Sequence, residues 1–277
     1  MGLDSGALVN AQGNAYTVDQ ALTNLQQTED AGLRYYAAWW LGRFRVGQPE
    51  AIAALRAALM DETDRSSDGG YPLRRNAARA LGKLGDRQVV PALIECLACS
   101  DYYVREAAAQ ALESLGDVRA IAPLRSLLAG GVEAALPVPG NPHLVQPYNA
   151  ILEALGSLGA TEAIGEITPF LSHGVAQVQN AAARALYQLT GDPAYCQALV
   201  GRLQGPNLQL RRSAMMDLGA IGYLPAAPAI AATPAENSLK LIALQQILEH
   251  HLEDRGFPEQ VLDPDSHQVL ALMDSLL

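Results

Sequence analysis

The sequence is poor in cysteine and in aromatic side chains. It has 3 Cys and 3 Phe among 277 residues, and Phe, Trp and Tyr together make up 5%. Three cysteines cannot build the disulfide framework of a small secreted scaffold. Cys96 and Cys99 stand one helical turn apart, without a second cysteine pair to complete a zinc site. We therefore predict buried thiols and no bound metal.

Positive charge is scarce too. Lys and Arg number 19 against 29 Asp and Glu, which gives a formal net charge of −10. Nucleic acids and anionic membrane surfaces repel such a chain. No apolar run approaches the ~18 residues of a membrane span, and the first residues lack the basic and apolar regions of a secretory signal. We expect a cytoplasmic protein that neither binds nucleic acid nor inserts into a membrane.

The motifs of common hydrolases, nucleotide-binding proteins and redox enzymes are missing. The chain contains no G-x-S-x-G, no P-loop, no G-x-G-x-x-G and no H-E-x-x-H. If the chain is an enzyme, its chemistry must therefore rest on another arrangement of side chains.

Alanine and leucine are abundant, and they form a repeat. Six segments share the pattern apolar-Arg-x-x-Ala-Ala-x-x-Leu-Gly, with local departures. Their aligned leucines are Leu41, Leu81, Leu112, Leu155, Leu186 and Leu218. Three intervals between these leucines are 31 or 32 residues long, and the other two are 40 and 43 residues long. A second apolar helical signal, such as residues 89–97, stands between successive segments.

A unit of this kind is a helical hairpin that cannot bury its apolar stripes alone, so the units must stack. We predict an all-α fold, an α–α superhelix of about six helical hairpins. Residues 1–16 are predicted to be a flexible N-terminal arm. Residues 17–277 are predicted to be one solenoid domain, with loop insertions at 61–72 and 129–147.

The repeated arginine follows an acid or amide by four residues. The three pairs are Asp30–Arg34, Asp101–Arg105 and Asn207–Arg211. In the fifth unit both partners change, to Val175 and Gln179. Because the partners are lost together, we predict a structural pair that braces the turn between helices, not a ligand site.

The first unit departs from the pattern by carrying four large aromatic residues, Tyr35, Tyr36, Trp39 and Trp40. The other units have mostly polar or small residues at these positions. Residues i and i+4 share a helix face, so Tyr35 and Trp39 are expected to form one aromatic surface. Two explanations are equally open: the rings seal the end of the stack, or they form an exposed platform for a flat ligand or another protein.

The two insertions are the second departure from the repeat. Residues 61–72 are acidic and contain glycine, and residues 129–147 contain four prolines and the isolated His143. Long loops on a rigid scaffold often carry binding sites. For any one of their acids or for His143, plain exposure to solvent is the better explanation, whereas for each loop as a whole binding and plain exposure explain the sequence equally well.

The stretches RYYAAWWLGRFRV (34–46) and PHLVQPYNAILEALGSL (142–158) resemble the E-type, or alpha, subunit of the heterodimeric E/F phycocyanobilin lyase family. The repeat resembles the HEAT-like repeat named after these phycobilisome lyases. The resemblance runs over essentially the whole chain, although the family more often has Glu where this chain has Asn149.

The resemblance implies a cyanobacterial lyase that acts with an F-type partner subunit. Such an enzyme attaches phycocyanobilin, a linear tetrapyrrole, through a thioether bond to a cysteine of the phycocyanin alpha subunit. Phycocyanobilin is then a substrate, and no tightly bound cofactor is expected. The acceptor supplies the nucleophile, so the lyase has to bind and orient the pigment.

We assign roles to site residues on this basis. The aromatic residues of the first unit would contact the chromophore or the partner. Carboxylates would stabilise the protonated bilin, basic residues would pair with its propionates, and a histidine would move a proton. The predicted chromophore-binding residues are Tyr35, Tyr36, Trp39, Trp40, Arg43, Asp61, Asp64, Arg75 and Arg79, and the predicted catalytic residues are Asp68 and His143.

Two other functions stay open from the sequence. The chain could be a non-catalytic scaffold or chaperone for phycobiliprotein assembly. It could also be a lyase for a related bilin or acceptor, such as the phycoerythrocyanin alpha subunit. Leucine-rich stripes in residues 238–252 and 267–277 would either cap the stack or dock a partner.

Overall fold

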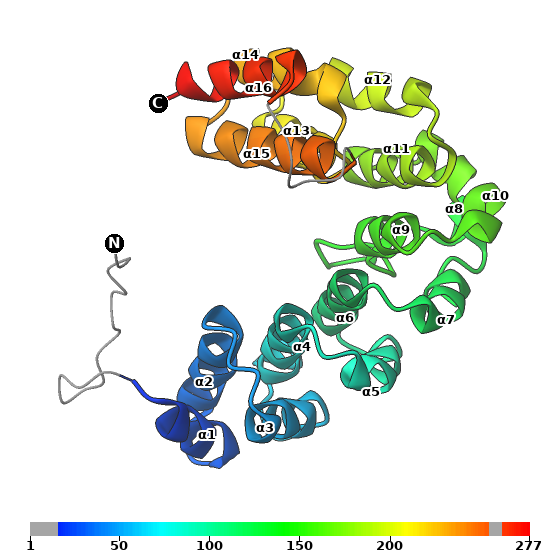
Figure 1. Ribbon diagram of the computed structural model, residues 1–277. Helices are drawn as coiled ribbons and strands as arrows, with labels where there is room; N and C mark the ends of the chain where they lie inside the picture. Colours follow the sequence, from blue (N-terminus) through cyan, green and yellow to red (C-terminus); the bar gives the residue numbers. More distant parts are fainter. Residues whose placement is uncertain (1–15, 255–261) are drawn as a thin grey trace. The chain divides into compact units, whose positions relative to one another are not determined.

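The computed structural model describes residues 16–254 and 262–277 (Figure 1). All regular structure in these ranges is helical, apart from one isolated antiparallel bridge between Pro137 and Leu144. The predicted all-α fold of stacked hairpins is confirmed. The predicted arm, residues 1–16, lies outside the described residues except for Tyr16. The chain forms two compact units, and each is described by itself.

Among the described residues, unit 1 comprises 16–127 and 137–147. Its helices are α1 Val18–Gln26, α2 Ala31–Arg43, α3 Pro49–Leu59, α4 Pro72–Leu84, η1 Arg87–Val89, α5 Val90–Cys96, α6 Tyr102–Leu115, η2 Val118–Ala120 and α7 Ile121–Ser126. Helices α2, α4 and α6 pack side by side in one layer, and α1, α3 and α5 pack against them (Figure 1). The aligned leucines Leu41, Leu81 and Leu112 are fully buried in this layer.

Of the residues that the structure describes, unit 2 comprises 128–136, 148–254 and 262–277. Its helices are α8 Gly131–Ala134, α9 Tyr148–Ser157, η3 Thr161–Ala163, α10 Ile164–Ile167, η4 Thr168–Ser172, α11 Ala176–Thr190, α12 Pro193–Arg202, α13 Leu208–Ala220, η5 Leu224–Ala226, α14 Ala227–Ala232, α15 Asn237–Asp254 and α16 Pro264–Asp274. Helices α9, α11, α13 and α15 pack in that order. Residues 61–71 hold no helix, whereas residues 129–147 contain the short helix α8.

A glycine-to-alanine contact joins successive helices of each layer. The glycine after the aligned leucine faces the alanine before the next one, in the pairs Gly42–Ala80, Gly82–Ala111 and Gly156–Ala185. A Cβ added to Gly82 would lie 2.8 Å from the Cα of Ala111, closer than carbon atoms can pack. The glycine therefore lets the two helix backbones approach directly.

The same contact reveals a hairpin that the sequence pattern did not show. Gly219 of α13 faces Ala243 of α15, and Leu244 after it is fully buried. Helix α14 packs on α15, and α16 covers both. The leucine-rich stripes of the C-terminal stretches are thus used, at least in part, to complete the core of unit 2: Leu244, Ile247 and Val269 are buried in it.

The repeated arginine does brace the turns, but it does not do so by pairing with the residue four positions earlier. Asp30, Asp101 and Asn207 instead cap the helices α2, α6 and α13, each accepting a hydrogen bond from a backbone N–H of the first turn. The side-chain pairing predicted from the sequence is therefore wrong.

Each arginine instead bridges two turns, as Arg211 shows. Its guanidinium donates to the carbonyl oxygen of Gly205 in the turn before α13 (2.7 Å) and to that of Pro234 in the turn before α15 (2.9 Å). Gln179 of the fifth unit makes a different bridge: its side chain donates to the His173 carbonyl in the turn before α11 and accepts from the Arg202 side chain at the end of α12. Arginine has five donors in a rigid fork, which suits it to satisfy carbonyls on both turns.

Replacing Gly82 with alanine is expected to destabilise the protein by about 1–3 kcal/mol, because the new methyl group forces α4 and α6 apart. Gly201 of α12 is the matched control: a Cβ there meets nothing within 4 Å. Gly201→Ala should raise stability by roughly 0.5–1 kcal/mol through helix propensity. Urea denaturation followed by circular dichroism measures both. If the two substitutions changed the free energy of unfolding equally, the proposed close contact between the backbones of α4 and α6 would be contradicted.

Candidate functional site

Residues 65–72 of the first insertion and residues 138–145 of the second, all within unit 1, meet around a cleft of about 800 Å³. Its lining comes from the first insertion, the N-terminal turns of α4 and α6, and the second insertion. The lining residues are Arg65, Ser66, Asp68, Gly69, Gly70, Tyr71, Pro72, Arg75, Ser100, Asp101, Tyr102, Tyr103, Arg105, Val138, Asn141, Pro142, His143 and Val145. The volume lies within the roughly 300–1,000 Å³ typical of small-molecule and cofactor sites.

The second insertion contributes an aromatic wall built on His143. The imidazole stacks on the Tyr102 ring, with ring centres 4.2 Å apart and planes 10° from parallel. The Tyr103 ring meets His143 edge-on, 6.0 Å away. Nδ1 of His143 donates to the Leu144 carbonyl (2.8 Å), because a carbonyl oxygen can only accept. Nε2 is therefore the atom that can take up a proton.

The first insertion contributes Asp68 to the lining of the cleft. The Asp68 carboxylate accepts a hydrogen bond from the Ser66 hydroxyl within a tight turn, which the Ser66 N–H closes by donating to the Gly70 carbonyl (3.0 Å). The Ser66 hydroxyl and nearby backbone N–H groups hold the pKa of Asp68 below its usual range. An anionic carboxylate thus faces the cleft near neutral pH.

The arginines of the cleft differ in how many hydrogen bonds they donate to acceptors within the protein. Arg65 donates to the Gly69 carbonyl (2.8 Å), and Arg105 donates to four acceptors. Arg75 is half-buried, and its Nε is buried without a hydrogen-bond partner among the described residues. Its guanidinium lies 5.8 Å from the Tyr103 ring centre. Arg75 is therefore available to an anionic ligand.

Glu106 lies one turn beyond Tyr102 on α6. Burial raises the pKa of its carboxyl, although the charges of Arg79 and Arg75 act in the opposite direction. Burial, Glu106 and Tyr103 together raise the pKa of Tyr102 to about 12 despite the nearby Arg105, so the phenol stays protonated and can donate a hydrogen bond. The cleft therefore combines flat rings, a hydroxyl donor, a carboxylate and a free cation.

The four aromatic residues of the first unit do not line this cleft. Three of them form a cluster: the rings of Tyr36 and Trp40 contact Tyr16, Trp40 also contacts Phe44, and Trp39 contacts Tyr36. Trp40 is buried, and its ring centre lies 5.2 Å from that of Tyr16 and 4.9 Å from that of Phe44. Trp39 is 38% exposed and packs 5.5 Å from Tyr36, where the sequence had led us to expect Tyr35. Trp40 thus seals the first unit of the stack, and Trp39 remains accessible.

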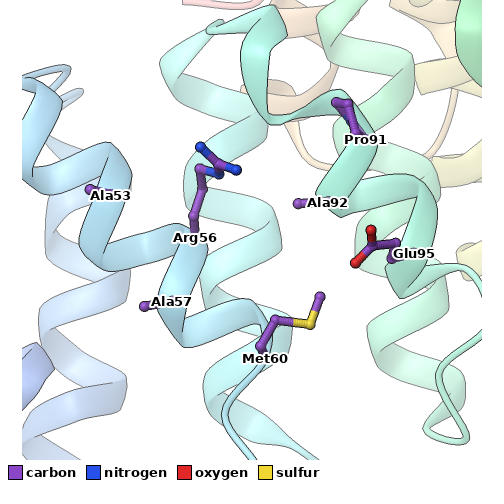
Figure 2. A pocket seen from close by; sticks show the side chains of 7 residues that line it. All are labelled: Ala53, Arg56, Ala57, Met60, Pro91, Ala92 and Glu95. Atoms are coloured by element: carbon purple, nitrogen blue, oxygen red, sulfur yellow. The ribbon is translucent and has the colours of Figure 1, made fainter.

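A second groove lies between the outer helices α3 and α5. Figure 2 shows its lining, which includes Arg56, Met60, Pro91 and Glu95 around the small side chains of α3. Its volume is about 390 Å³. None of the predicted site residues lines it.

Comparisons with known proteins agree with the repeat. The family model for HEAT repeats matches residues 65–135 and 147–223, and the PBS lyase HEAT-like repeat matches residues 33–60. Phycocyanobilin lyase subunit alpha of Synechocystis sp. is 68% identical over 95% of this chain and 97% of its own length. The chain belongs to the phycocyanobilin lyase alpha-subunit family.

Other relatives support the same family. Phycocyanobilin lyase subunit alpha of Synechococcus elongatus is 57% identical over 95% of this chain and 97% of its own length. A chain in the structure of the complex of CpcE and CpcF of phycocyanin lyase from Nostoc sp. PCC7120 is 56% identical, covers 100% of both chains and has a TM-score of 0.88. The family predicted from residues 34–46 and 142–158 is confirmed.

The family assignment does not by itself place the predicted site residues. The structure brings Asp68, Arg75 and His143 together in the cleft. Arg79 is exposed on α4, one turn from Arg75, and Arg43 is exposed at the end of α2. Asp64 is half-buried, and burial together with Asp61 raises its pKa although the charge of Arg34 lowers it. The binding roles of these residues stay predictions.

Asp61 is engaged within the protein. Its carboxylate accepts from the buried Arg34 (2.6 Å), from the N–H and hydroxyl of Thr63 and from the N–H of Asp64. Arg34 also donates to the Leu25 carbonyl, so the pair bridges the end of α1 and the start of the first insertion. Asp61 therefore holds the insertion and is not free for a pyrrole.

Tyr102 and Tyr103 form much of the cleft and were missed from the sequence. The aromatic residues of the first unit follow the repeated arginine, whereas these tyrosines precede Arg105. A pair of adjacent tyrosines stands at these positions in the third unit, and the fifth and sixth units have Ala176–Gln177 and Leu208–Gln209 there. That difference is the signal that could have found them.

No helix in the described part of the chain is both long and apolar enough to cross a bilayer.

Replacing Asp61 with asparagine is expected to lower the stability by about 3–5 kcal/mol at pH 7, because it leaves the buried Arg34 without its counter-charge. Burial alone would raise the pKa of Asp61, but the hydrogen bonds from Arg34, Asp64 and Thr63 hold it well below its usual range. A carboxyl whose pKa is lower in the folded state than in the unfolded state increases the free energy of unfolding. This contribution is complete above the unfolded-state pKa of about 3.9, and it is lost as the pH falls from there toward the folded-state pKa.

The difference in free energy of unfolding between wild type and Asp61→Asn should therefore become smaller below about pH 4. Urea titrations at pH 7, 4 and 3 measure it. A difference that stays constant with pH would contradict the role of the ionised carboxylate.

Proposed function

We propose that this chain is the alpha subunit of a lyase that joins phycocyanobilin by a thioether bond to a cysteine of the phycocyanin alpha subunit. In this proposal it acts with an F-type partner subunit, as the Nostoc relative assembles in the complex of CpcE and CpcF. The observation that supports it most is a cleft with a histidine–tyrosine wall and an arginine whose Nε has no hydrogen-bond partner among the described residues, in a chain 68% identical to a phycocyanobilin lyase subunit alpha.

The proposed reaction needs a bound, oriented pigment and a path for one proton. The acceptor sulfur bonds to the ethylidene carbon of ring A as the carbon–carbon π bond breaks, and the thiol proton ends on the bilin. No oxidant or reductant takes part. The lyase holds the reacting carbon in line with the incoming thiol and excludes other nucleophiles.

Each cleft residue has a task in this proposal. The rings of Tyr102 and His143 lie parallel, so a conjugated pyrrole can extend their stack. Arg75 pairs with a propionate. The Asp68 carboxylate stabilises a protonated pyrrole, and Nε2 of His143 moves the proton. Trp39 and Tyr36, outside the cleft, are proposed as an additional contact to pigment or partner.

Among the functions left open by the sequence, the phycocyanobilin lyase has the most support. Relatives with that name are 56–68% identical to this chain, whereas the bilin biosynthesis protein PecE of Mastigocladus laminosus is 48% identical. Phycocyanobilin is therefore our first choice of bilin, and a related bilin or acceptor is the second. Action in the cyanobacterial cytosol stays a prediction.

Covalent attachment tests the proposal directly. The chain is co-expressed with an F-type partner, the phycocyanin alpha subunit and phycocyanobilin, and the acceptor is then denatured in acidic urea. Colour that stays on the acceptor is the expected result. Colour lost on denaturation would show a scaffold instead, and omission of either lyase subunit is the control for spontaneous addition.

Replacing Arg75 with alanine is expected to weaken phycocyanobilin binding by the two-subunit lyase about tenfold or more, because hydrogen bonds to charged groups contribute about 1.5–3 kcal/mol. Arg56→Ala is the matched control, since Arg56 is an exposed arginine of the outer groove in Figure 2. Titration of bilin absorbance gives both affinities. Equal affinities of the two variants would exclude Arg75 as the propionate partner.

A further inference from the structure

The N-terminal turn of α6 contacts both insertions at once. The Asp101 carboxylate accepts from the N–H of Tyr71 at the end of the first insertion (2.7 Å) and from the N–H of Tyr103 in its own helix (2.8 Å). Gly70 leaves room for this contact, because a Cβ there would lie 3.1 Å from the same carboxylate and 2.9 Å from the Ser66 hydroxyl. One wall of the cleft is therefore hydrogen-bonded to α6 through Asp101.

Arg105 holds the other wall. Its guanidinium donates to the carbonyl of Val145 (2.8 Å) and to the side-chain oxygen of Gln146 (2.8 Å) in the second insertion. The same group donates to the carbonyls of Cys99 (2.6 Å) and Ser100 (3.0 Å) in the turn before α6. Four acceptors on two segments fix the guanidinium, and through it they fix the backbone two residues beyond His143.

The third contact of this turn is the stack of Tyr102 on His143. Tyr102 stands between Asp101 and Arg105 in the sequence, so the groups that hold the two walls flank the ring that supports the imidazole. The second insertion closes on itself by a hydrogen bond from the Val138 N–H to the His143 carbonyl (3.0 Å). The orientation of His143 therefore depends on the bonds that Arg105 makes to residues 145 and 146.

We propose that Asp101 and Arg105 are positioning residues of the attachment reaction, which fix the two cleft walls and set the His143 ring against Tyr102. This inference rests on the proposed function. It assigns no chemical step to either residue. Their contribution is the placement of the pigment-facing groups, and a displacement of about 1 Å at such groups can lower a rate by about a hundredfold.

The repeat provides a matched control for Arg105. Arg211 occupies the same position in α13 and likewise donates to the carbonyls of two turns, those of Gly205 and Pro234. Neither of the turns that Arg211 bonds to belongs to an insertion, and Arg211 does not line the cleft. A purely structural arginine and a positioning arginine can therefore be compared within one protein.

The experiment uses the two-subunit lyase with phycocyanobilin and the phycocyanin alpha subunit. Arg105→Ala should lower kcat for covalent attachment about 10- to 100-fold and should change the induced circular dichroism of the bound bilin. Arg105→Lys, which keeps the charge but not the planar fork, should restore part of both. Arg211→Ala should leave kcat and the bilin spectrum within about twofold of wild type while lowering the Tm. Asp101→Asn tests the first wall with the same readouts.

The inference is overturned if Arg105→Lys and Arg211→Ala change kcat and the bilin spectrum in proportion to their loss of Tm alone. It is also overturned if Arg105→Ala keeps the wild-type spectrum and rate. Should Arg105→Ala fail to fold, the comparison of Arg105→Lys with Arg211→Lys decides. Failure of the proposed function is a different result, because wild type itself would then leave no colour on the denatured acceptor.

Discussion

The structure depends on hydrogen-bonded bridges between consecutive turns. In the bridges made by Arg105 and Arg211, one side chain satisfies carbonyl oxygens of the turn before its own helix and of a later turn. Unpaired backbone carbonyls are costly where water is excluded. The bridge therefore lets short helices follow one another closely without leaving the ends of the turns unsatisfied.

The bridges also explain where the candidate site forms. An insertion that lengthens a turn of this fold remains attached to the donor that served the shorter turn. Arg34 holds the first insertion through Asp61 and Thr63, and Arg105 holds the second through Val145 and Gln146. Two long loops become ordered walls in this way, and the side chains between them acquire fixed relative positions.

Much of the helical framework could be predicted from the sequence, because the spacing of leucine, alanine and glycine reports local packing. The last hairpin escaped detection, since α15 keeps the contact of Ala243 with Gly219 but has no Arg-x-x-Ala-Ala pattern. The site was predicted less completely. Asp68, Arg75 and His143 belong to segments up to about seventy residues apart, and only the fold shows that they share one cleft. Asp61 looked available in the sequence because its partner, Arg34, lies 27 residues earlier.

The direct backbone contacts of Gly42, Gly82, Gly156 and Gly219 have a consequence for divergence within the family. Such contacts leave no space for a larger side chain, so the helices can accept little change without separating. The loops between them carry no comparable restriction, provided that their ends keep the acceptors for Arg34 and Arg105. The two insertions can therefore diverge in sequence while the helical framework stays the same.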